Sequence, residues 1–417
     1  MKHPACPVFL LLLAHATAFS QTVRLSLDQA VDTALTRNGN IRFAELGVRQ
    51  SGSRVNELKS MRLPSLLLNS HYLHTPEAGY NEVVTNGGEY GLQLSASVPV
   101  VDGGARNALI DQSINMEEQS TITLEKNKRD VTFAVRSVYY GILQFQEEVR
   151  IRREIVERLE DYLKLLRQLR LGGTATESDV LKAQVDLNNA RIALESAQQE
   201  VRKSTLALKN VAGIPFDRDV ETVPLSDSGE SAPVPEFSIE TNPDVQLTER
   251  SRRSAEFDIS AARAERFPTL TVSGDAGALG VTPREFSSDL GYSILLSLDL
   301  PLFDWGAINR RIEQKEFARD QFDIQLQLQK REIETEWRST LGDIDLQKRN
   351  LVNYSQNIGE ADRNYLSAKS RFAGGSGSNL EVLEAQRLLG EVKLNYNSTL
   401  FQLRLDFATA LRLSGKQ

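Results

Sequence analysis

The chain of 417 residues contains one cysteine, Cys6, and four histidines. If its first residues are removed as an export signal, no disulfide, cysteine-bound metal or thiol nucleophile is possible. His71 and His74 lie three apart on an expected strand, so they would point to opposite faces and make poor joint metal ligands. The motif Gly-x-x-x-x-Gly-Lys-[Ser/Thr] is absent, which argues against a nucleotide site. We therefore expect no catalytic centre, no metal and no cofactor.

Basic clusters and long apolar runs are also missing. The formal net charge is −7 and no block of five or more basic residues occurs, so binding to nucleic acid is not expected. Beyond the N-terminus no segment has the ~20 unbroken apolar residues that a membrane helix needs. Any membrane crossing must therefore use β-strands.

The first twenty residues have the pattern of a signal peptide. Lys2 precedes a short apolar run from Val8 to Leu13, and small residues follow up to Ser20, after which we expect cleavage. Cys6 lies before the apolar run, where a lipoprotein cysteine would have to follow it, so no lipid anchor is expected.

The rest of the chain is two copies of one unit. From Pro99 onward the copies match at an offset of 202 residues, whereas Pro64 and Pro268 differ by 204. The matching segments are Arg62-Leu63-Pro64 with Arg266-Phe267-Pro268, Asp102-Gly103-Gly104 with Asp304-Trp305-Gly306, Gly172-Gly173 with Gly374-Gly375, and Val180 to Gln184 with Val382 to Gln386. We therefore divide the chain into a signal peptide (1–20), a first repeat (21–215), a proline-containing linker (216–238) and a second repeat (239–417).

Each copy has the same expected order of helix, strand, strand, helix and helix. A helix ends before the proline of each Arg-x-Pro segment, because proline cannot continue it. Asp102 and Asp304 are expected N-caps of helices of ~65 residues, which a glycine turn separates from a second helix. The expected first helices and strands are Leu25–Arg62, Ser65–His74 and Tyr90–Val98 in copy one, and Asn242–Arg266, Thr269–Asp275 and Leu290–Leu300 in copy two.

Two periodic patterns support this order. Apolar and polar residues alternate along the expected strands, as from Leu290 to Leu300, over a length that fits a tilted crossing of a bilayer. The last helix of each copy has apolar residues at alternate steps of three and four, beginning at Val180 and at Val382. This spacing favours coiled-coil packing, and an ordinary buried face of a bundle is the alternative.

The strand count constrains assembly. Each chain supplies four strands, fewer than the eight of the smallest single-chain bacterial barrels. An open four-stranded sheet in lipid would leave unpaired edges. Either the strands do not face lipid, or two or three chains share one barrel.

The sequence resembles the TolC-like outer membrane factors. The strongest motif runs from Arg371 to Arg387, and copy one carries its paired version from Gly172 to Gln184. Phe372 and Glu381 depart from the tyrosine and aspartate that are usual in the family. The resemblance implies a mainly α fold with a small β part, in which three chains share a 12-stranded outer-membrane barrel and the coiled-coil helices form a periplasmic α-barrel. It implies no enzymatic activity.

The resemblance also implies partners and a location. A homotrimer in outer-membrane lipid, with a large periplasmic portion, would meet a periplasmic adaptor and an inner-membrane transporter of RND, ABC or MFS type. It would be the passive exit duct of a tripartite efflux pump or type I secretion system, for small molecules or exported polypeptide. The alternative function is a soluble periplasmic coiled-coil scaffold or adaptor.

The same resemblance suggests two groups of site residues. The periplasmic gate candidates are Glu381, Glu384, Asp179, Lys182 and Arg387. Lys182 or Arg387 could pair with Glu381 and hold the mouth shut. Candidate adaptor contacts at the helix tips are Gly172, Gly173, Thr176, Phe372, Gly374, Gly375 and Ser378. The alternatives are that the carboxylates are simply solvated on the helix surface, and that the glycines serve only to form the turns.

Aromatic residues gather near the expected strand ends. They suit the aromatic girdles of membrane barrels, although ordinary core packing is the alternative for each. These residues are Tyr72, Tyr80, Tyr90, Tyr292, Phe303 and Trp305.

Overall fold

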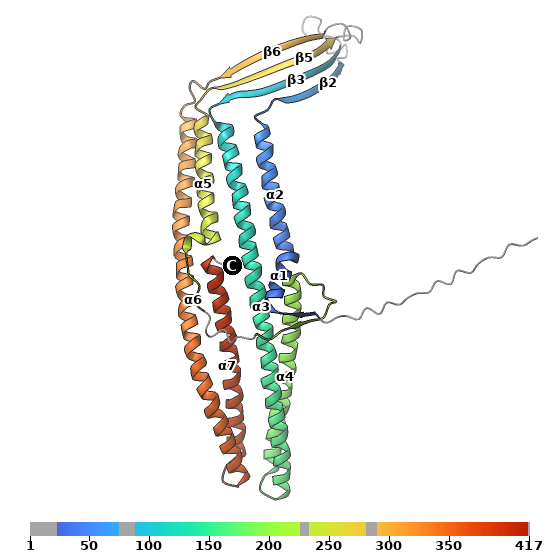
Figure 1. Cartoon of the computed structure of the whole chain (residues 1–417), viewed down its shortest axis with the longest axis vertical. Coiled ribbons are helices and arrows are strands. Elements are labelled where there is room, and N and C mark those ends of the chain that lie inside the picture. Colours follow the sequence, from blue (N-terminus) through green and yellow to red (C-terminus); the bar gives the residue numbers. More distant parts are fainter. Residues whose placement is uncertain (1–22, 75–87, 226–232, 281–289, 416–417) are drawn as a thin grey trace, which may run out of the picture. The chain divides into compact units, whose positions relative to one another are not determined.

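The computed structural model describes residues 23–74, 88–225, 233–280 and 290–415 (Figure 1). The expected signal peptide, Tyr80 and almost all of the two loops that join the strands lie outside these residues. Copy one contains β1 (Val23–Leu25), α1 (Leu27–Arg37), α2 (Gly39–Ser60), β2 (Ser65–His74), β3 (Gly88–Asp102), α3 (Ala105–Leu171) and α4 (Glu177–Ala212). After β4 (Val220–Thr222) and the short helix η2 (Ile239–Thr241), copy two contains α5 (Pro243–Ala264), β5 (Thr269–Gly280), β6 (Leu290–Asp299), α6 (Ala307–Ala373) and α7 (Asn379–Ser414).

The expected order of helix, two strands and two helices is confirmed in both copies, with one correction to the first helix. The single helix expected over Leu25–Arg62 is two helices, which meet at Asn38. Asn38 has an extended backbone (ψ 129°), and its side chain accepts a hydrogen bond from the amide of Asn40. Asparagine competes with helical hydrogen bonding in this way, and so it ends α1 and caps α2.

A small parallel ladder was not expected. β1 pairs with β4, with Arg24 opposite Glu221. The Arg24 Nε donates to that carboxylate over 2.9 Å. β4 lies in the stretch expected to be linker, where three residues carry no periodic signal that sequence reasoning could use.

The structure consists of two compact units, which we describe separately. The first contains described residues 23–37, 134–225 and 351–401. The second contains 38–74, 88–133, 233–280, 290–350 and 402–415. No helix in the described part of the chain is long and apolar enough to cross a membrane.

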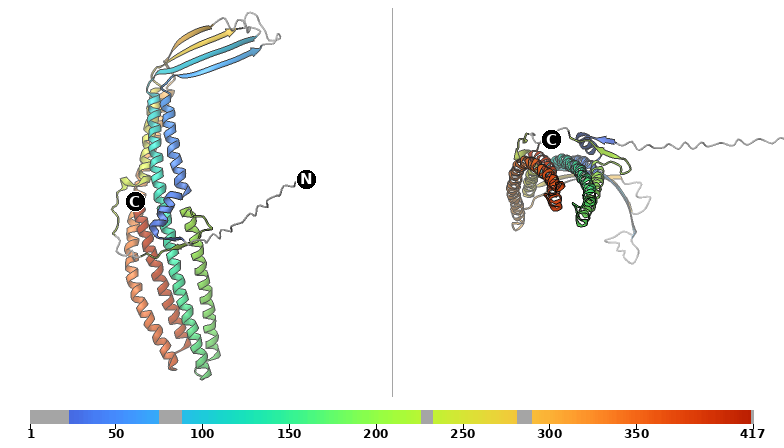
Figure 2. Two further views of the ribbon diagram at one scale, coloured as in Figure 1. Left: turned by 45° about the vertical axis from the view of Figure 1, so that its right-hand side comes forward. Right: turned by 90° about the horizontal axis from the view of Figure 1, so that it is seen from below.

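In the first unit the last parts of α3 and α6 lie beside α4 and α7 (Figures 1 and 2). Their shared core includes Tyr162, Leu166, Ala183, Phe372 and Val382. The apolar residues that recur at alternate steps of three and four along α4 and α7 are buried or half-buried at every position. Coiled-coil packing and an ordinary buried bundle face both require this burial.

The second unit holds one antiparallel sheet with the strand order β2-β3-β5-β6. β3 pairs with β5, Val98 lying opposite Val272, so the sheet joins copy one to copy two. The ring of Tyr72 lies 4.8 Å from that of Tyr90, its cross-strand partner. β2 and β6 are the edges, each paired on one side only within the described chain.

The second unit also shows how strands become helices. Asp102 accepts hydrogen bonds from the amides of Gly104 (3.1 Å) and Arg106 (3.3 Å). Asp304 accepts from the amides of Gly306 (2.9 Å) and Ile308 (2.6 Å). Both aspartates thus cap the long helices, as expected.

Candidate functional site

Two glycine turns end the helix hairpins of the first unit. Gly173 and Gly375 have φ of 76° and 77°, a left-handed conformation that favours glycine. Gly172 and Gly374 have no such backbone, and a Cβ on either would lie 3.5 Å from the nearest atom, at an ordinary contact distance. The expected role of glycine in the reversals is therefore confirmed at Gly173 and Gly375.

The two turns are built alike. The amide of Thr174 donates to the carbonyl of Leu169 over 2.9 Å, and the amide of Ser376 donates to the carbonyl of Arg371 over the same distance. Each bond closes the last turn of a long helix onto the glycine loop. The duplication seen in the sequence thus extends to the hydrogen bonds of the turns.

Two gate candidates, Asp179 and Glu381, form hydrogen bonds with the residues that precede their helices. The Thr176 hydroxyl accepts from the Asp179 amide (3.2 Å), and the Asp179 carboxylate accepts from the Thr176 amide (2.9 Å), which completes a capping box. In copy two the Ser378 hydroxyl accepts from the Glu381 amide over 3.2 Å. Hydrogen bonding from Thr176 lowers the pKa of the Asp179 carboxyl.

Glu381 forms a different ion pair from the one expected. Its carboxylate accepts from Arg371 over 3.0 Å, across the glycine turn of copy two. Arg387 instead pairs with Glu384 (2.7 Å) and Glu391 (2.9 Å). The expected pairing of Glu381 with Lys182 or Arg387 is therefore wrong for this structure, because Arg371 and Glu384 lie closer in their own hairpin.

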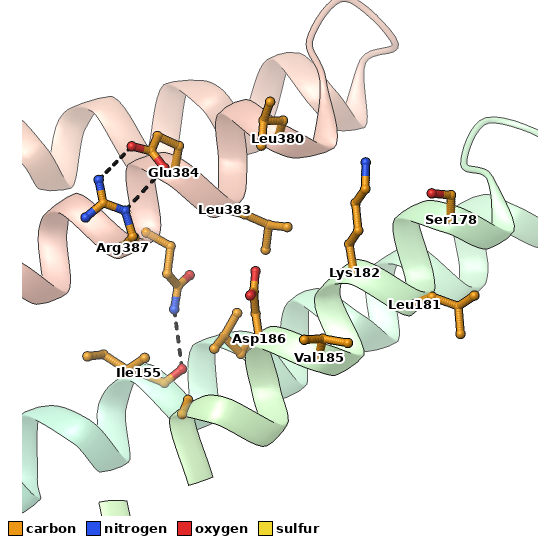
Figure 3. Close-up of a pocket in the computed structure, with 13 residues that line it drawn as sticks. Ile155, Ser178, Leu181, Lys182, Val185, Asp186, Leu380, Leu383, Glu384 and Arg387 are labelled. Carbon is orange, nitrogen blue, oxygen red and sulfur yellow. Dashed lines mark hydrogen bonds and ion pairs between the residues drawn. The ribbon is translucent and has the colours of Figure 1, made fainter. Parts of the chain in front are cut away.

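The other three gate candidates surround one pocket. Lys182 on α4 and both Glu384 and Arg387 on α7 line a cavity of about 640 Å³ whose walls are mostly apolar (Figure 3). Asp186 lies on the same wall as Lys182, and burial raises the pKa of its carboxyl. The hydrogen bond from Arg387 lowers the pKa of Glu384. Of the five gate candidates, Asp179 and Glu381 thus bond to the residues that precede their helices. The other three line the pocket.

A buried polar link joins the two tips. The Tyr162 hydroxyl donates to Asn379 Oδ1 over 2.8 Å, and Asn379 Nδ2 donates to Asp179 Oδ1 over 3.1 Å. Burial raises the pKa of Tyr162, so its hydroxyl stays a donor at neutral pH. Phe372 packs edge-on against Tyr162 and is 6% exposed, so it belongs to the core of the tip.

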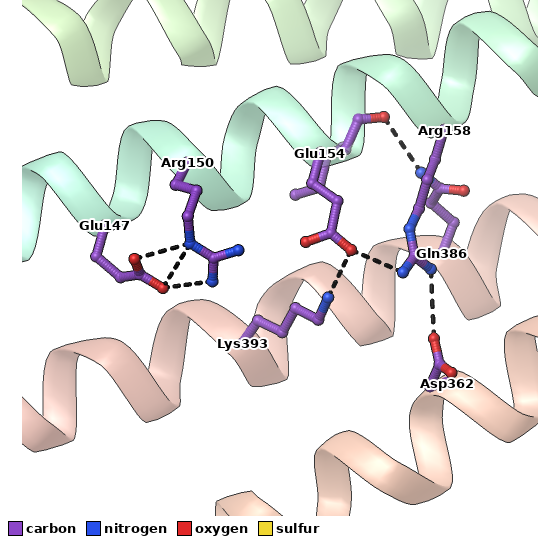
Figure 4. A network of polar contacts seen from close by, with 8 residues as sticks. Glu147, Arg150, Glu154, Arg158, Asp362, Gln386 and Lys393 are labelled. Atoms are coloured by element: carbon purple, nitrogen blue, oxygen red, sulfur yellow. Dashed lines mark hydrogen bonds and ion pairs between the residues drawn. The ribbon is translucent and has the colours of Figure 1, made fainter.

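A charged network crosses the same unit further along the helices (Figure 4). Glu154 on α3 accepts from Lys393 on α7 and from Arg158, each over 2.7 Å. Arg158 reaches Asp362 on α6 over 3.4 Å. Burial alone would raise the pKa of Glu154, but its two cationic partners outweigh burial and lower it. Protonation of Glu154 would therefore weaken its bonds to Lys393 and Arg158, whereas the Arg158–Asp362 pair does not involve Glu154.

Sequence reasoning missed the capping role although its signal was present. Thr176 with Asp179, and Ser378 with Glu381, have the spacing of a capping box. The role of Asn379 had no such signal, because copy one has Glu177 at the equivalent position.

Among the described residues, no three or more histidine, cysteine, aspartate or glutamate side chains are grouped so as to hold a metal ion. The arrangement offers charged side chains, two glycine turns and one mostly apolar pocket.

Solved structures share the fold. The outer membrane protein VceC of Vibrio cholerae matches with a TM-score of 0.80 and 16% identity, over 93% of this chain and 96% of that one. A structure of CusC matches with a TM-score of 0.86 and 15% identity, over 100% and 99%. CusC is described as forming a transmembrane channel, and at this identity both structures show the fold alone.

Sequence relatives cover most of the chain. The pyoverdine export outer membrane protein OpmQ of Pseudomonas aeruginosa is 24% identical over 383 residues, which are 87% of this chain and 79% of OpmQ. The probable efflux pump outer membrane protein TtgC of Pseudomonas putida is 22% identical over 377 residues, or 87% and 77%. The family described as outer membrane efflux protein matches twice, over residues 30–214 and 234–412. The chain is therefore a member of the outer membrane efflux protein family, which is TolC-like.

Proposed function

We propose that three copies of this outer membrane efflux protein assemble into a passive exit duct. Each chain would contribute four strands to a shared 12-stranded barrel in the outer membrane. Its long helices would continue the duct into the periplasm. Family membership does not favour the alternative, a soluble periplasmic scaffold or adaptor.

The sheet edges are the observation that carries this proposal. β2 and β6 end the sheet, and all ten residues of β2 are exposed in the single chain. On β6 the apolar side chains Leu290, Ile294 and Leu298 are 86%, 76% and 65% exposed. Lipid would cover such a face but does not tolerate unpaired backbone edges, so further copies must close the sheet. Three copies leave an interior wide enough for passage.

The helices suit a tunnel. α3 and α6 each have 67 residues, or about 100 Å at 1.5 Å per residue. Both end at the glycine turns, which we place at the periplasmic mouth. There Glu381 and Glu384 of three chains would gather six carboxylates around one axis and attract cations.

The tips would meet the other parts of a pump. Gly172, Gly173, Thr176, Gly374, Gly375 and Ser378 present small polar surfaces that suit the hairpin of a periplasmic adaptor. Phe372 is left out because it is buried. The adaptor would connect the duct to an inner-membrane transporter of RND, ABC or MFS type. The names of the relatives include pyoverdine export and antibiotic efflux, so we propose transport of a small molecule through the duct.

Native mass measurement of the detergent-purified protein tests the assembly. We expect a trimer, recovered from the outer membrane fraction and resistant to salt washing. A stable monomer, or recovery in the soluble periplasm, would contradict the duct.

A further inference from the structure

The pocket of the first unit is large enough to hold a small molecule. It is lined by residues of α3, α4 and α7, and its volume is about 640 Å³ (Figure 3). Pockets that bind drug-sized ligands measure about 300–1,000 Å³. Leu181 and Val185 on α4 are 57% and 56% exposed, and Leu380 on α7 is 68% exposed. The pocket therefore offers an apolar surface that this chain leaves uncovered.

Two opposite charges on α4 face this surface without a partner. Lys182 and Asp186 lie four residues apart, and both side chains point toward α7 (Figure 3). Neither forms a hydrogen bond or an ion pair within the described residues. A lysine that precedes an acid by four residues is the weaker order for a helical ion pair, so the two have little tendency to neutralise each other. Burial alone raises the pKa of Asp186, and no neighbouring cation opposes it.

The charges on the opposite wall are already satisfied. Arg387 forms an ion pair with Glu384 over 2.7 Å. Lys182 and Glu384 are equivalent positions of the two copies, and so are Asp186 and Leu388. The unpartnered pair therefore occurs in copy one only and is not a consequence of the repeat.

We propose that this pocket binds a small amphipathic zwitterion, which carries an amine and a carboxylate at one end of an apolar body. The carboxylate of the ligand pairs with Lys182, and its amine pairs with Asp186. The apolar body covers Leu181, Val185 and Leu380. Binding depends on the first unit alone, whereas a role of this ligand as cargo rests on the proposed export function.

The arrangement of charges favours a zwitterion over a simple ion. A ligand with only an amine would be attracted by Asp186 but repelled by Lys182, and a ligand with only a carboxylate would meet the reverse. Side chains four residues apart on a helix have Cβ atoms about 5–6 Å apart, and the long lysine side chain can adjust to a carboxylate that lies beside an amine. A bound amine would also restore a charged partner to a carboxyl group that lies among apolar side chains.

Three fluorescent compounds with the same apolar body test the ligand class. Nε-dansyl-lysine carries both charges, dansylcadaverine carries only the amine, and N-dansyl-aminocaproic acid carries only the carboxylate. Binding to the full chain is measured by isothermal titration calorimetry at neutral pH, with the same detergent in cell and syringe. We expect Nε-dansyl-lysine to bind about tenfold more tightly than either analogue, because it gains one further charged contact.

Variants assign each charge to its partner. Lys182→Gln should abolish the advantage of Nε-dansyl-lysine over dansylcadaverine, and Asp186→Asn should abolish its advantage over N-dansyl-aminocaproic acid. Lys203→Gln is the matched control, because it removes a charge from an exposed lysine of α4 that does not line the pocket. Val185→Trp should weaken all three compounds, because the larger ring would fill the pocket without any change of charge.

The outcomes separate this ligand from the proposed duct. A trimer by native mass that binds the three compounds equally, or that binds them unchanged in Val185→Trp, would overturn the ligand site and leave the duct standing. A monomer that shows the expected preferences would contradict the duct and support the ligand site.

Discussion

The Tyr162 hydroxyl donates a hydrogen bond of 2.8 Å to Asn379 Oδ1, and so joins α3 of copy one to the first turn of α7 in copy two. Asn379 continues the link to the carboxylate and carbonyl of Asp179 on α4, over 3.1 and 3.3 Å. Tyr162 and Asn379 are 1% and 5% exposed, so water cannot easily replace either partner. The two hairpin tips of the first unit are therefore coupled through one buried amide.

Replacing Tyr162 by phenylalanine should loosen the tips. The change leaves a buried amide oxygen unsatisfied, which costs about 1–2 kcal/mol. Amide hydrogen exchange around the two glycine turns should accelerate by roughly tenfold, which corresponds to about 1.4 kcal/mol. Tyr365→Phe is the matched control, because the Tyr365 ring is also buried and its hydroxyl makes no hydrogen bond within the described residues. Equal acceleration in both variants would refute a specific role for the link.

Acid should weaken the tip of copy one through Asp179. The folded-state pKa of its carboxyl lies below the unfolded value near 4, chiefly because Thr176 hydrogen-bonds the carboxylate. A lowered pKa adds stability that is fully present above the unfolded pKa and is lost as the pH falls through the folded value. Hydrogen exchange at the start of α4 should therefore accelerate as the pH falls below about 4, beyond its intrinsic pH dependence. In Asp179→Asn this extra acceleration should disappear, and its persistence would assign the effect to another group.

The repeat structure could be predicted because it rests on strong periodic signals. Prolines at 64 and 268 and alternation from Leu290 to Leu300 marked the helix ends and strands, which the structure places within a few residues. The break at Asn38 was missed because an asparagine within an apolar pattern has either a surface or a capping role. The pairing of β1 with β4 depends on residues almost 200 positions apart, which no local signal reports.

The site was harder to predict than the fold. The carboxylates were assigned by resemblance, but their partners depend on side-chain positions that spacing does not determine. Arg371 reaches Glu381 only because the glycine turn folds back on the helix. The backbone conformation at Trp305 could not be predicted either. Its φ is 55°, a value that a non-glycine residue rarely adopts, and the equivalent residue of copy one is Gly103.

A charge at the tip should uncouple export from folding. Gly374→Asp adds a carboxylate at the proposed adaptor contact, and Gly374 has no left-handed backbone and no tight neighbour. We expect near-normal amounts in the outer membrane and a several-fold loss of efflux. Gly375→Ala is the counterpart, since it adds no charge but strains a backbone with φ of 77° by about 1 kcal/mol. Full efflux with Gly374→Asp at normal expression would argue against contact at this turn.

Removing charge from the proposed mouth should change ion selectivity. Glu381→Gln with Glu384→Gln keeps side-chain size and helix propensity while it removes six carboxylates from a trimer. In planar bilayers the double variant should lose its preference for cations, and a trivalent cation should need at least a tenfold higher concentration to block it. Stability should change little, because the ion pairs to Arg371 and Arg387 are exposed.

Arg387→Gln supplies the opposite test of the same mouth. Arg387 neutralises Glu384 at 2.7 Å within one chain, so its removal should free that carboxylate and strengthen block by cations. The two variants should therefore move the blocking concentration in opposite directions from the natural protein. If neither variant changes selectivity or block, Glu381 and Glu384 face the outside of the helices, and the gate must lie elsewhere along the duct.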